Sequence, residues 1–269
     1  MIRHWKKALL ALLLLGGATY AAALGYVYAR QENLLFHPDP LPVDHAFRRA
    51  ADVQELSIPV PGATLSALSL QLPHPKAVVF FLHGNGGNLE SWFINLDFYR
   101  RANVDLFMID YRGYGKSTGR IDSEAQLRAD VRAAWDSIAT RYAGIPRVVY
   151  GRSLGTGLAA GLSADVSPAL TVLVSPYCSM QALAAEHFPL VPAALLRYPL
   201  DTCADAARIH GPMLLVHGQH DTLVPPHHSE ELLAAAPQAH LLRIPDAAHN
   251  DVHEFEVYRQ ALRDALAGL

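Results

Sequence analysis

The eight residues VVYGRSLG (148–155) contain the strongest structural signal in this 269-residue chain. Val148–Tyr150 has the composition of a buried strand, and the residues from Leu154 onward have that of a helix. Between them, Gly151-Arg152-Ser153-Leu154-Gly155 matches the pattern G-x-S-x-G. So tight a strand-to-helix turn needs small neighbours and makes the serine hydroxyl project above the sheet. We therefore predict that Ser153 is a nucleophile at the carboxyl end of a strand.

Nearly continuous apolar runs recur on both sides of that turn, and such runs are typical of strands buried on both faces of a parallel sheet. They are Ala77–Leu82, Val104–Ile109, Leu170–Val174 and Met213–Val216, with a last strand at His240–Ile244. Val53–Pro59 and Leu65–Leu72 alternate partially, as half-exposed antiparallel strands do. The helical stretches between them are Leu89–Arg101, Glu124–Tyr142, Leu154–Ala164, His228–Ala235 and His253–Leu266. This alternation predicts an open α/β sheet with right-handed crossovers.

Two segments depart from the alternation. Residues 179–209 carry only weak helical patterns and lie between two core strands, so they are expected to form a lid over the carboxyl ends of the strands. Residues 31–52 are rich in proline and are expected to be a linker. The predicted organisation is a membrane anchor at 1–30, this linker, and one catalytic domain at 53–269.

Polar residues follow the ends of two further strands. Asp221 comes soon after Met213–Val216, and His249 follows the last strand. We predict that His249 is the general base and that Asp221 orients its imidazole. Asp246 and Asp251 are too close to His249 along the chain to approach it from behind, and they are expected to be turn and cap residues.

A glycine-rich loop, His83-Gly84-Asn85-Gly86-Gly87-Asn88, follows another strand. Hydrolysis of an acyl group passes through a tetrahedral oxyanion, which needs two backbone N–H donors aimed at it. We expect one donor to be Leu154, next to the nucleophile, and the other to be Asn85, with Gly86 as the alternative. His83 is expected to support this loop through a backbone hydrogen bond.

Five ordered blocks, HGNGGN, DYRGYGKS, GRSLGTG, HGQHDTLVP and AHND, resemble the motifs of α/β hydrolases. The similarity extends over about residues 30–265 and is to one branch of the α/β hydrolases, which includes the single-pass, membrane-anchored α/β-hydrolase-domain proteins and the serine-aminopeptidase-like hydrolases. It implies an α/β-hydrolase fold: a mostly parallel, eight-stranded sheet flanked by helices, with a short lid and an N-terminal transmembrane helix. Carried over block by block, it implies Ser153, Asp221 and His249 as catalytic residues in the usual chain order. Known members include esterases, lipid hydrolases and protein depalmitoylases.

The N-terminus has the pattern of a membrane anchor. Ala8–Ala29 contains no charged residue and, as a helix, is about 33 Å long, against roughly 30 Å of hydrocarbon. Arg3, Lys6 and Lys7 before it favour a cytoplasmic N-terminus and a catalytic domain outside the cytoplasm. The alternative is a signal peptide cleaved near Ala21–Ala23, which gives a secreted or periplasmic protein. The apolar stretch continues past that site, which favours the anchor.

The composition excludes other classes of partner. A net charge of −3 gives no basic surface for nucleic acid. The GKS of residues 115–117 lacks the glycine that a phosphate-binding loop has at the position of Asp110, so a structural turn is expected. The histidines at 217, 220, 227 and 228 have no matched ligand spacing and are expected to be surface or loop residues, with no metal and no cofactor. The two cysteines, Cys178 and Cys203, form either a disulfide or two free thiols.

These observations predict a serine hydrolase that cleaves carboxylic esters or thioesters through an acyl-enzyme. The anchor and the apolar lid sequence FPLVPAALL favour lipid-like acyl substrates. Two alternatives remain open. One is an aminopeptidase-like enzyme, for which Glu186 or Asp205 would bind an α-amino group. The other is a non-enzymatic scaffold anchored in the membrane.

Overall fold

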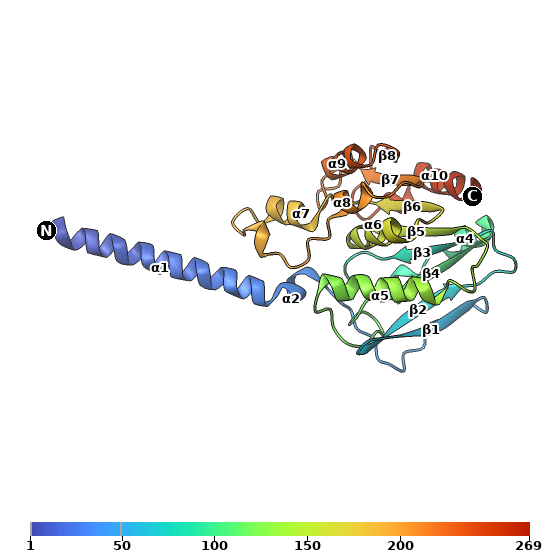
Figure 1. The fold of residues 1–269 in the computed structure, drawn as a ribbon, viewed down its shortest axis with the longest axis horizontal. Helices are drawn as coiled ribbons and strands as arrows, with labels where there is room; N and C mark the ends of the chain where they lie inside the picture. Colours follow the sequence, from blue (N-terminus) through green and yellow to red (C-terminus); the bar gives the residue numbers. More distant parts are fainter. Residues whose placement is uncertain (1, 49) are drawn as a thin grey trace.

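A computed structural model describes residues 2–48 and 50–269. Its centre is one eight-stranded sheet in the order β1-β2-β4-β3-β5-β6-β7-β8 (Figure 1). β1 pairs with β2 and β2 with β4 in antiparallel fashion, and every other neighbouring pair is parallel. The mostly parallel sheet expected from the apolar runs is therefore confirmed.

The strands lie close to their predicted bounds. They are β1 (Val53–Val60), β2 (Ala63–Leu70), β3 (Ala77–Leu82), β4 (Val104–Ile109), β5 (Arg147–Arg152), β6 (Leu170–Val174), β7 (Met213–Gly218) and β8 (His240–Ile244). Every residue of β3, β4, β6 and β7 is buried, as the continuous apolar runs predicted.

Helices cover both faces of the sheet. The larger packed layer involves α5 (Glu124–Ser137), α6 (Leu154–Val166), α8 (Thr202–Ala206) and α9 (His227–Ala235). The opposite layer involves α3 (Leu89–Trp92), α4 (Leu96–Ala102) and α10 (Glu256–Ala267). Because each face has its own core, the loops at the carboxyl ends of the strands stand on a rigid base.

The prediction of a single helix over Leu89–Arg101 is wrong. It divides into α3 and α4, because Phe93 leaves the helical region and Asn95 takes a left-handed conformation with φ of 59°. Similarly, the last helix begins at Glu256, after a short 3₁₀ turn η2 (Val252–Glu254), rather than at His253. Local backbone conformations of this kind are set by the packing of neighbouring loops and leave no trace in hydrophobic periodicity.

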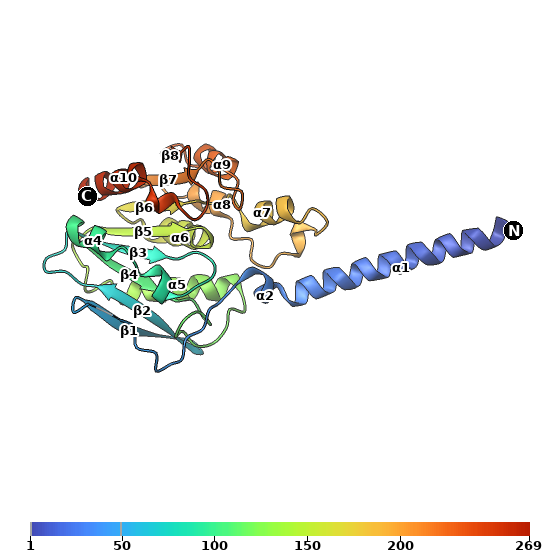
Figure 2. The ribbon, with the colours of Figure 1, turned by 180° about the vertical axis from the view of Figure 1, so that it is seen from behind.

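The N-terminal helix α1 (Ile2–Ala29) projects from the body of the protein, as Figures 1 and 2 both show. Its stretch His4–Ala29 is long and apolar enough to cross a membrane, and none of it is buried within the protein. A short helix α2 (Gln31–Leu35) follows. Beyond α2 the chain is irregular but packed, because Phe36 and Phe47 are buried against the body, as Gln31 of α2 is.

The segment between β6 and β7 carries α7 (Met180–His187), the 3₁₀ turn η1 (Ala193–Leu195) and α8. A disulfide joins Cys178 to Cys203 across it, with the Cα atoms 4.8 Å apart. Sequence alone left this pairing open, since it gives no Cα distance. Closing a loop over a separation of 25 residues stabilises the fold by roughly 3.5 kcal/mol in the chain-entropy description.

Candidate active site

Ser153 stands at the turn from β5 into α6 in a strained conformation. Its φ is 49° and its ψ is −119°, a region that residues with a side chain rarely adopt. Its N–H donates to the carbonyl of Val174 at the end of β6, at 2.9 Å. The two glycines of the motif allow this turn: a Cβ on Gly155 would lie 2.1 Å from the Leu82 carbonyl oxygen, and one on Gly151 would lie 2.6 Å from the Gly155 oxygen. The sheet and the helix therefore leave room only for glycine at positions 151 and 155.

The imidazole of His249 lies between Ser153 and Asp221. Its Nε2 is 2.9 Å from the hydroxyl oxygen of Ser153, and its Nδ1 is 2.7 Å from Oδ2 of Asp221. The three residues come from loops that follow β5, β7 and β8, so the parallel strands bring together side chains that are up to 96 positions apart. This arrangement can move a proton from the serine to the imidazole while the carboxylate stabilises the resulting cation.

Asp221 is held ionised within the protein. Its side chain is fully buried, which raises its pKa, but hydrogen bonds from His217 and His249 outweigh this, and the pKa lies below its usual range. Oδ1 of Asp221 also accepts the N–H groups of Leu223 and Val224, at 3.0 and 2.8 Å. The carboxylate therefore presents a fixed negative charge to the back of the imidazole.

His217 is a positioning residue that sequence reasoning missed. It was expected at the surface or in a loop, but it lies fully buried within β7, with Nε2 3.4 Å from Oδ2 of Asp221. Nε2 also lies 2.8 Å from the Val224 carbonyl, and Nδ1 lies 2.5 Å from the hydroxyl of Ser229. Its place one residue before the end of a buried strand was the available signal.

The glycine-rich loop after β3 brings Asn85 to the edge of the sheet at which Leu154 begins α6. Within residues 2–48 and 50–269, the backbone N–H groups of Asn85 and Leu154 have no hydrogen-bond acceptor, so both are free to bind an oxyanion. The N–H of Gly86 is already used, because it donates to the side-chain oxygen of Asn85 at 3.1 Å. Of the two candidate donors in this loop, Asn85 is therefore better suited.

The side chain of Asn85 ties this loop to the segment that follows the N-terminal helices. Its amide donates to the carbonyl of Leu35, and its oxygen accepts the N–H of His37 at 3.0 Å and the hydroxyl of Tyr114 at 2.8 Å. His83, fully buried, lies with Nδ1 2.7 Å from the Gly84 carbonyl. The loop is thus held from both sides.

Arg152 connects the nucleophile turn to the histidine loop. Its guanidinium donates to the backbone carbonyls of His249 and Asn250, at 3.3 and 2.9 Å. It also lies over the ring of Trp92, whose indole N–H donates to the Gly86 carbonyl at 2.9 Å. The variable position of the G-x-S-x-G motif therefore links the nucleophile turn to the histidine loop and to the glycine-rich loop, which the motif alone did not indicate.

The other singled-out residues lie outside the proton relay. Oδ1 of Asp251 accepts the N–H of Ala248 at 2.7 Å, so it shapes the histidine loop instead of contacting the ring. Lys116 of the GKS sequence pairs with Glu55 and with the carbonyl of His45, which leaves it committed to the surrounding turn.

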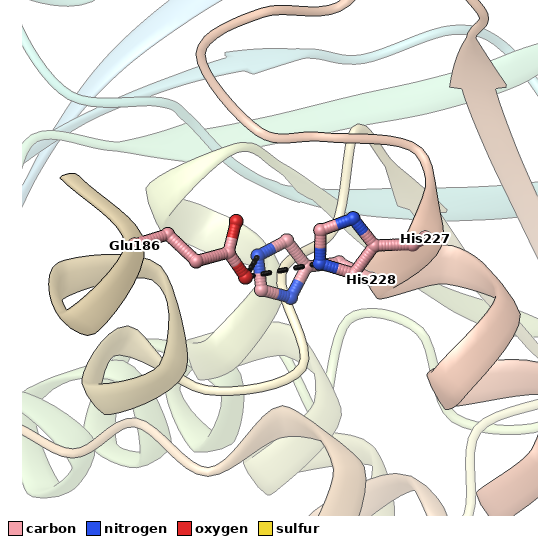
Figure 3. A group of neighbouring side chains, drawn as sticks. All are labelled: Glu186, His227 and His228. Carbon is pink, nitrogen blue, oxygen red and sulfur yellow. Dashed lines mark hydrogen bonds and ion pairs between the residues drawn. The ribbon is translucent and has the colours of Figure 1, made fainter.

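A second group of titratable side chains joins the lid to α9: Glu186 of α7 with His227 and His228 (Figure 3). Oε1 of Glu186 lies 2.9 Å from Nε2 of His227 and 3.4 Å from Nε2 of His228. The three residues have the composition of a zinc site. However, Nδ1 of His228 accepts the N–H of Cys178 at 3.3 Å, whereas a metal on Nε2 requires a proton on Nδ1. The group therefore fits a polar clasp between lid and body better than a metal site. His228 is fully buried, contrary to the surface position expected for it.

Strand order, nucleophile turn and loop positions together define an α/β-hydrolase fold. The Pyrococcus furiosus esterase Pf2001 has the same fold, with a TM-score of 0.68 at 19% identity over 87% of this chain and 97% of that one. Alpha/beta hydrolase domain-containing protein 10 from mouse is a further structural neighbour, with a TM-score of 0.58 at 16% identity over 80% of this chain and 97% of that one.

Sequence comparison gives the family. Residues 73–203 match the family model described as serine aminopeptidase, S33. The chain is 32% identical to alpha/beta hydrolase domain-containing protein 17B of Xenopus laevis over 201 residues, which is 72% of this chain and 68% of that protein. It is 31% identical to an uncharacterised Mycobacterium tuberculosis protein over 245 residues, 86% of this chain and 84% of the other. The chain therefore belongs to the α/β-hydrolase superfamily and is a hydrolase.

The packing around the nucleophile turn predicts the effect of one added methyl group. Gly155→Ala would force the turn away from Leu82, because the new Cβ has no space. We expect a loss of about 1–3 kcal/mol in the free energy of unfolding and of about 100-fold in hydrolytic rate. Gly211→Ala is the matched control, since its Cβ would lie 3.4 Å from its nearest neighbour. Urea unfolding and ester hydrolysis measure both effects, and a Gly155→Ala enzyme as active as the control would contradict this account.

The burial of His228 predicts how the free energy of unfolding depends on pH. Burial lowers the pKa of His228, so the folded protein keeps this imidazole neutral, whereas histidine in the unfolded chain titrates near pH 6.5. As the pH falls through about 6.5, the unfolded chain binds a proton that the folded chain does not, and the free energy of unfolding falls. His253, whose pKa is also lowered by burial, contributes with the same sign.

We expect the slope of unfolding free energy against pH, between about pH 7 and 5.5, to be smaller in His228→Asn than in the wild type. The comparison of slopes does not depend on the overall stability of the variant. Urea titrations at a series of pH values provide the measurement. Equal slopes in the two proteins would show that His228 is not held neutral.

Proposed function

We propose that this hydrolase cleaves carboxylic esters or thioesters through a Ser153–His249–Asp221 relay and an acyl-enzyme. The observation that carries the proposal is the position of the His249 ring, with one nitrogen 2.9 Å from the serine oxygen and the other 2.7 Å from the carboxylate. These are the distances at which a general base and its orienting acid work.

In the first step, His249 takes the proton of the Ser153 hydroxyl as the serine oxygen attacks the acyl carbonyl. The carbonyl oxygen becomes an oxyanion and accepts the free N–H groups of Asn85 and Leu154, and each such donor contributes about 3–4 kcal/mol in the transition state. The intermediate then collapses. His249 gives its proton to the departing alcohol or thiol, and the acyl group remains on Ser153.

In the second step, a water molecule takes the place of the leaving group. His249 accepts a proton from this water, the hydroxide oxygen attacks the acyl carbon, and the serine oxygen leaves and recovers the proton. Asp221 stays ionised in both steps, because its hydrogen bonds hold its pKa below the usual range. It stabilises the imidazolium each time one forms.

The substrate class follows from the surroundings of the site. The apolar helix α1 supports attachment to a membrane, with the basic residues at its start favouring a cytoplasmic N-terminus. The lid between β6 and β7 adds a further apolar surface that includes Phe188 and Leu190. Both features favour acyl chains of lipid-like length over acetyl groups.

A peptidase is the second candidate, since the matching family model is described as a serine aminopeptidase. Binding of an α-amino group would need a carboxylate free to receive it. Glu186 already pairs with His227, and Asp205 pairs with Arg128 and Arg208. These contacts leave both candidate carboxylates occupied, which favours an ester or thioester substrate.

The role of Ser153 can be tested by covalent labelling. We expect a fluorophosphonate probe to label the wild type and to leave Ser153→Ala unlabelled, because the probe reacts only with an activated serine. Asp221→Asn should lower kcat by about 10⁴-fold, through loss of the correct imidazole tautomer. Ser163→Ala, on the same helix α6, is the control and should label normally. Labelling of the Ser153→Ala protein would assign the chemistry to another residue, and no labelling of the wild type would favour the scaffold.

The acyl preference can be tested with p-nitrophenyl esters of increasing chain length. We expect kcat/KM to rise from acetate to medium and long chains, because each methylene buried in an apolar site contributes about 0.8 kcal/mol. Aminoacyl amides, measured in parallel, test the peptidase alternative. A sharp optimum at acetate would remove the lipid-like substrate class.

A further inference from the structure

The tip of the lid is a continuous apolar surface. Residues 188–196, FPLVPAALL, contain no charged or hydrogen-bonding side chain. Phe188 is 64% exposed and Leu190 is 79% exposed, although each side chain would gain about 1.5–3 kcal/mol from full burial. Large apolar side chains grouped at a protruding tip are typical of a surface that contacts a partner.

This tip lies against the N-terminal helix. The hydroxyl of Tyr20, on α1, donates to the carbonyl of Leu190 at 2.7 Å. Tyr20 is nine residues before the end of α1 at Ala29, so the contact lies up to about 13 Å along the helix from that end. Half of a bilayer's hydrocarbon core is about 15 Å thick. If α1 spans a bilayer, the tip of the lid therefore lies within the same leaflet as the C-terminal part of α1.

A second set of contacts joins the lid to α2. The position of the lid along the axis of α1 is therefore defined at two points. The buried side chain of Gln31 donates to the carbonyl of Leu195 at 2.6 Å and accepts the N–H of Arg197 at 2.8 Å. Glu32 accepts the hydroxyl of Tyr198 at 2.6 Å and pairs with Arg197.

Part of the backbone of the tip is already hydrogen-bonded within the protein, which limits the cost of an apolar environment, where each unpaired polar group costs several kcal/mol. Among its nine positions, Pro189 and Pro192 have no N–H. Four other N–H groups donate within the lid, those of residues 188, 191, 195 and 196. Tyr20 and Gln31 satisfy the carbonyls of Leu190 and Leu195.

Charged and aromatic residues mark where this apolar layer ends. α1 is followed directly by Arg30, and the tip is followed directly by Arg197. Both arginines line one cavity of about 370 Å³ at the base of α1, and the guanidinium of Arg197 lies over the ring of Tyr28. Arginine and tyrosine at one level are typical of the boundary between hydrocarbon and headgroups.

We propose that residues 188–196 insert into the bilayer beside α1, so that the catalytic edge of the sheet faces the lipid surface. The proposal rests on the membrane attachment put forward above. The lid follows β6, and Ser153 follows the neighbouring strand β5, so the lid and the nucleophile stand at the same edge of the sheet. An amphiphilic acyl ester would then reach Ser153 from the leaflet in which it already resides.

Site-directed spin labels in the full-length chain, reconstituted in vesicles of phosphatidylcholine and phosphatidylglycerol, test the insertion. Because the native cysteines form a disulfide, Leu190→Cys provides the reactive thiol. We expect its nitroxide to collide mainly with oxygen, as one at Leu15→Cys within α1 should, and little with a water-soluble nickel chelate. Val257→Cys on α10, also an exposed apolar position at 47%, is the aqueous control.

A label at 190 that behaves like the one at 257, while the label at 15 is in lipid, overturns the insertion and leaves the anchor intact. A label at 15 that is itself aqueous overturns both the insertion and the anchor. Neither spin-label result depends on catalysis. A failure of the proposed hydrolase mechanism can therefore be distinguished from a failure of the proposed insertion.

Activity provides a second readout. We expect Leu190→Asp to lower the hydrolysis of a long-chain ester presented in vesicles by at least tenfold and to change the hydrolysis of a soluble short-chain ester far less. Val257→Asp should change neither rate. Equal rates for Leu190→Asp and wild type on the vesicle substrate would contradict the proposal.

Discussion

The positive φ of Ser153 is the constraint on which the rest of the site depends. A residue with a side chain in this conformation costs of order 1–3 kcal/mol, and it persists only where the surroundings leave no alternative. Here the hydrogen bond to Val174 and the close packing at Gly155 supply that restriction. The hydrogen bond acts through the parallel pairing of β5 with β6, and the packing at Gly155 acts through the parallel pairing of β5 with β3. The buried centre of the sheet thus maintains the strained conformation of Ser153. This conformation points the serine oxygen toward the imidazole of His249, which lies in the loop after β8.

The imidazole of His249 is held in place as firmly as Ser153. Asp221 accepts hydrogen bonds from two backbone N–H groups and from His249, and His217 stands behind it within the strand. A carboxylate with so many donors loses little by being buried, because each hydrogen bond to an ionised group contributes about 1.5–3 kcal/mol. It needs no rearrangement when the imidazole becomes charged, and such preorganisation is the main way in which polar sites lower a reaction barrier.

The parts predictable from sequence were those governed by a single local rule. Strands buried on both faces, such as Ala77–Leu82, were predicted to the residue, because a continuous apolar run has few other solutions in a covered sheet. The positions of Ser153, Asp221 and His249 after strand ends followed from the same reasoning. The break at Asn95 was missed, since a left-handed residue depends on loops that pack from elsewhere. The burial of His217 and His228 was missed for a related reason: their partners Ser229 and Glu186 come from other elements.

The segment after the N-terminal helices acts physically as part of the catalytic body. Gln31 binds the lid at Leu195, and four to six residues later the backbone of Leu35 and His37 binds Asn85 of the glycine-rich loop. Seven consecutive residues therefore contact the lid on one side and a candidate oxyanion donor on the other. These residues belong to the stretch that its composition predicted to be a linker, and their contacts join the apolar helix to the site. Through these contacts, the residues that follow α1 position the loop that carries Asn85.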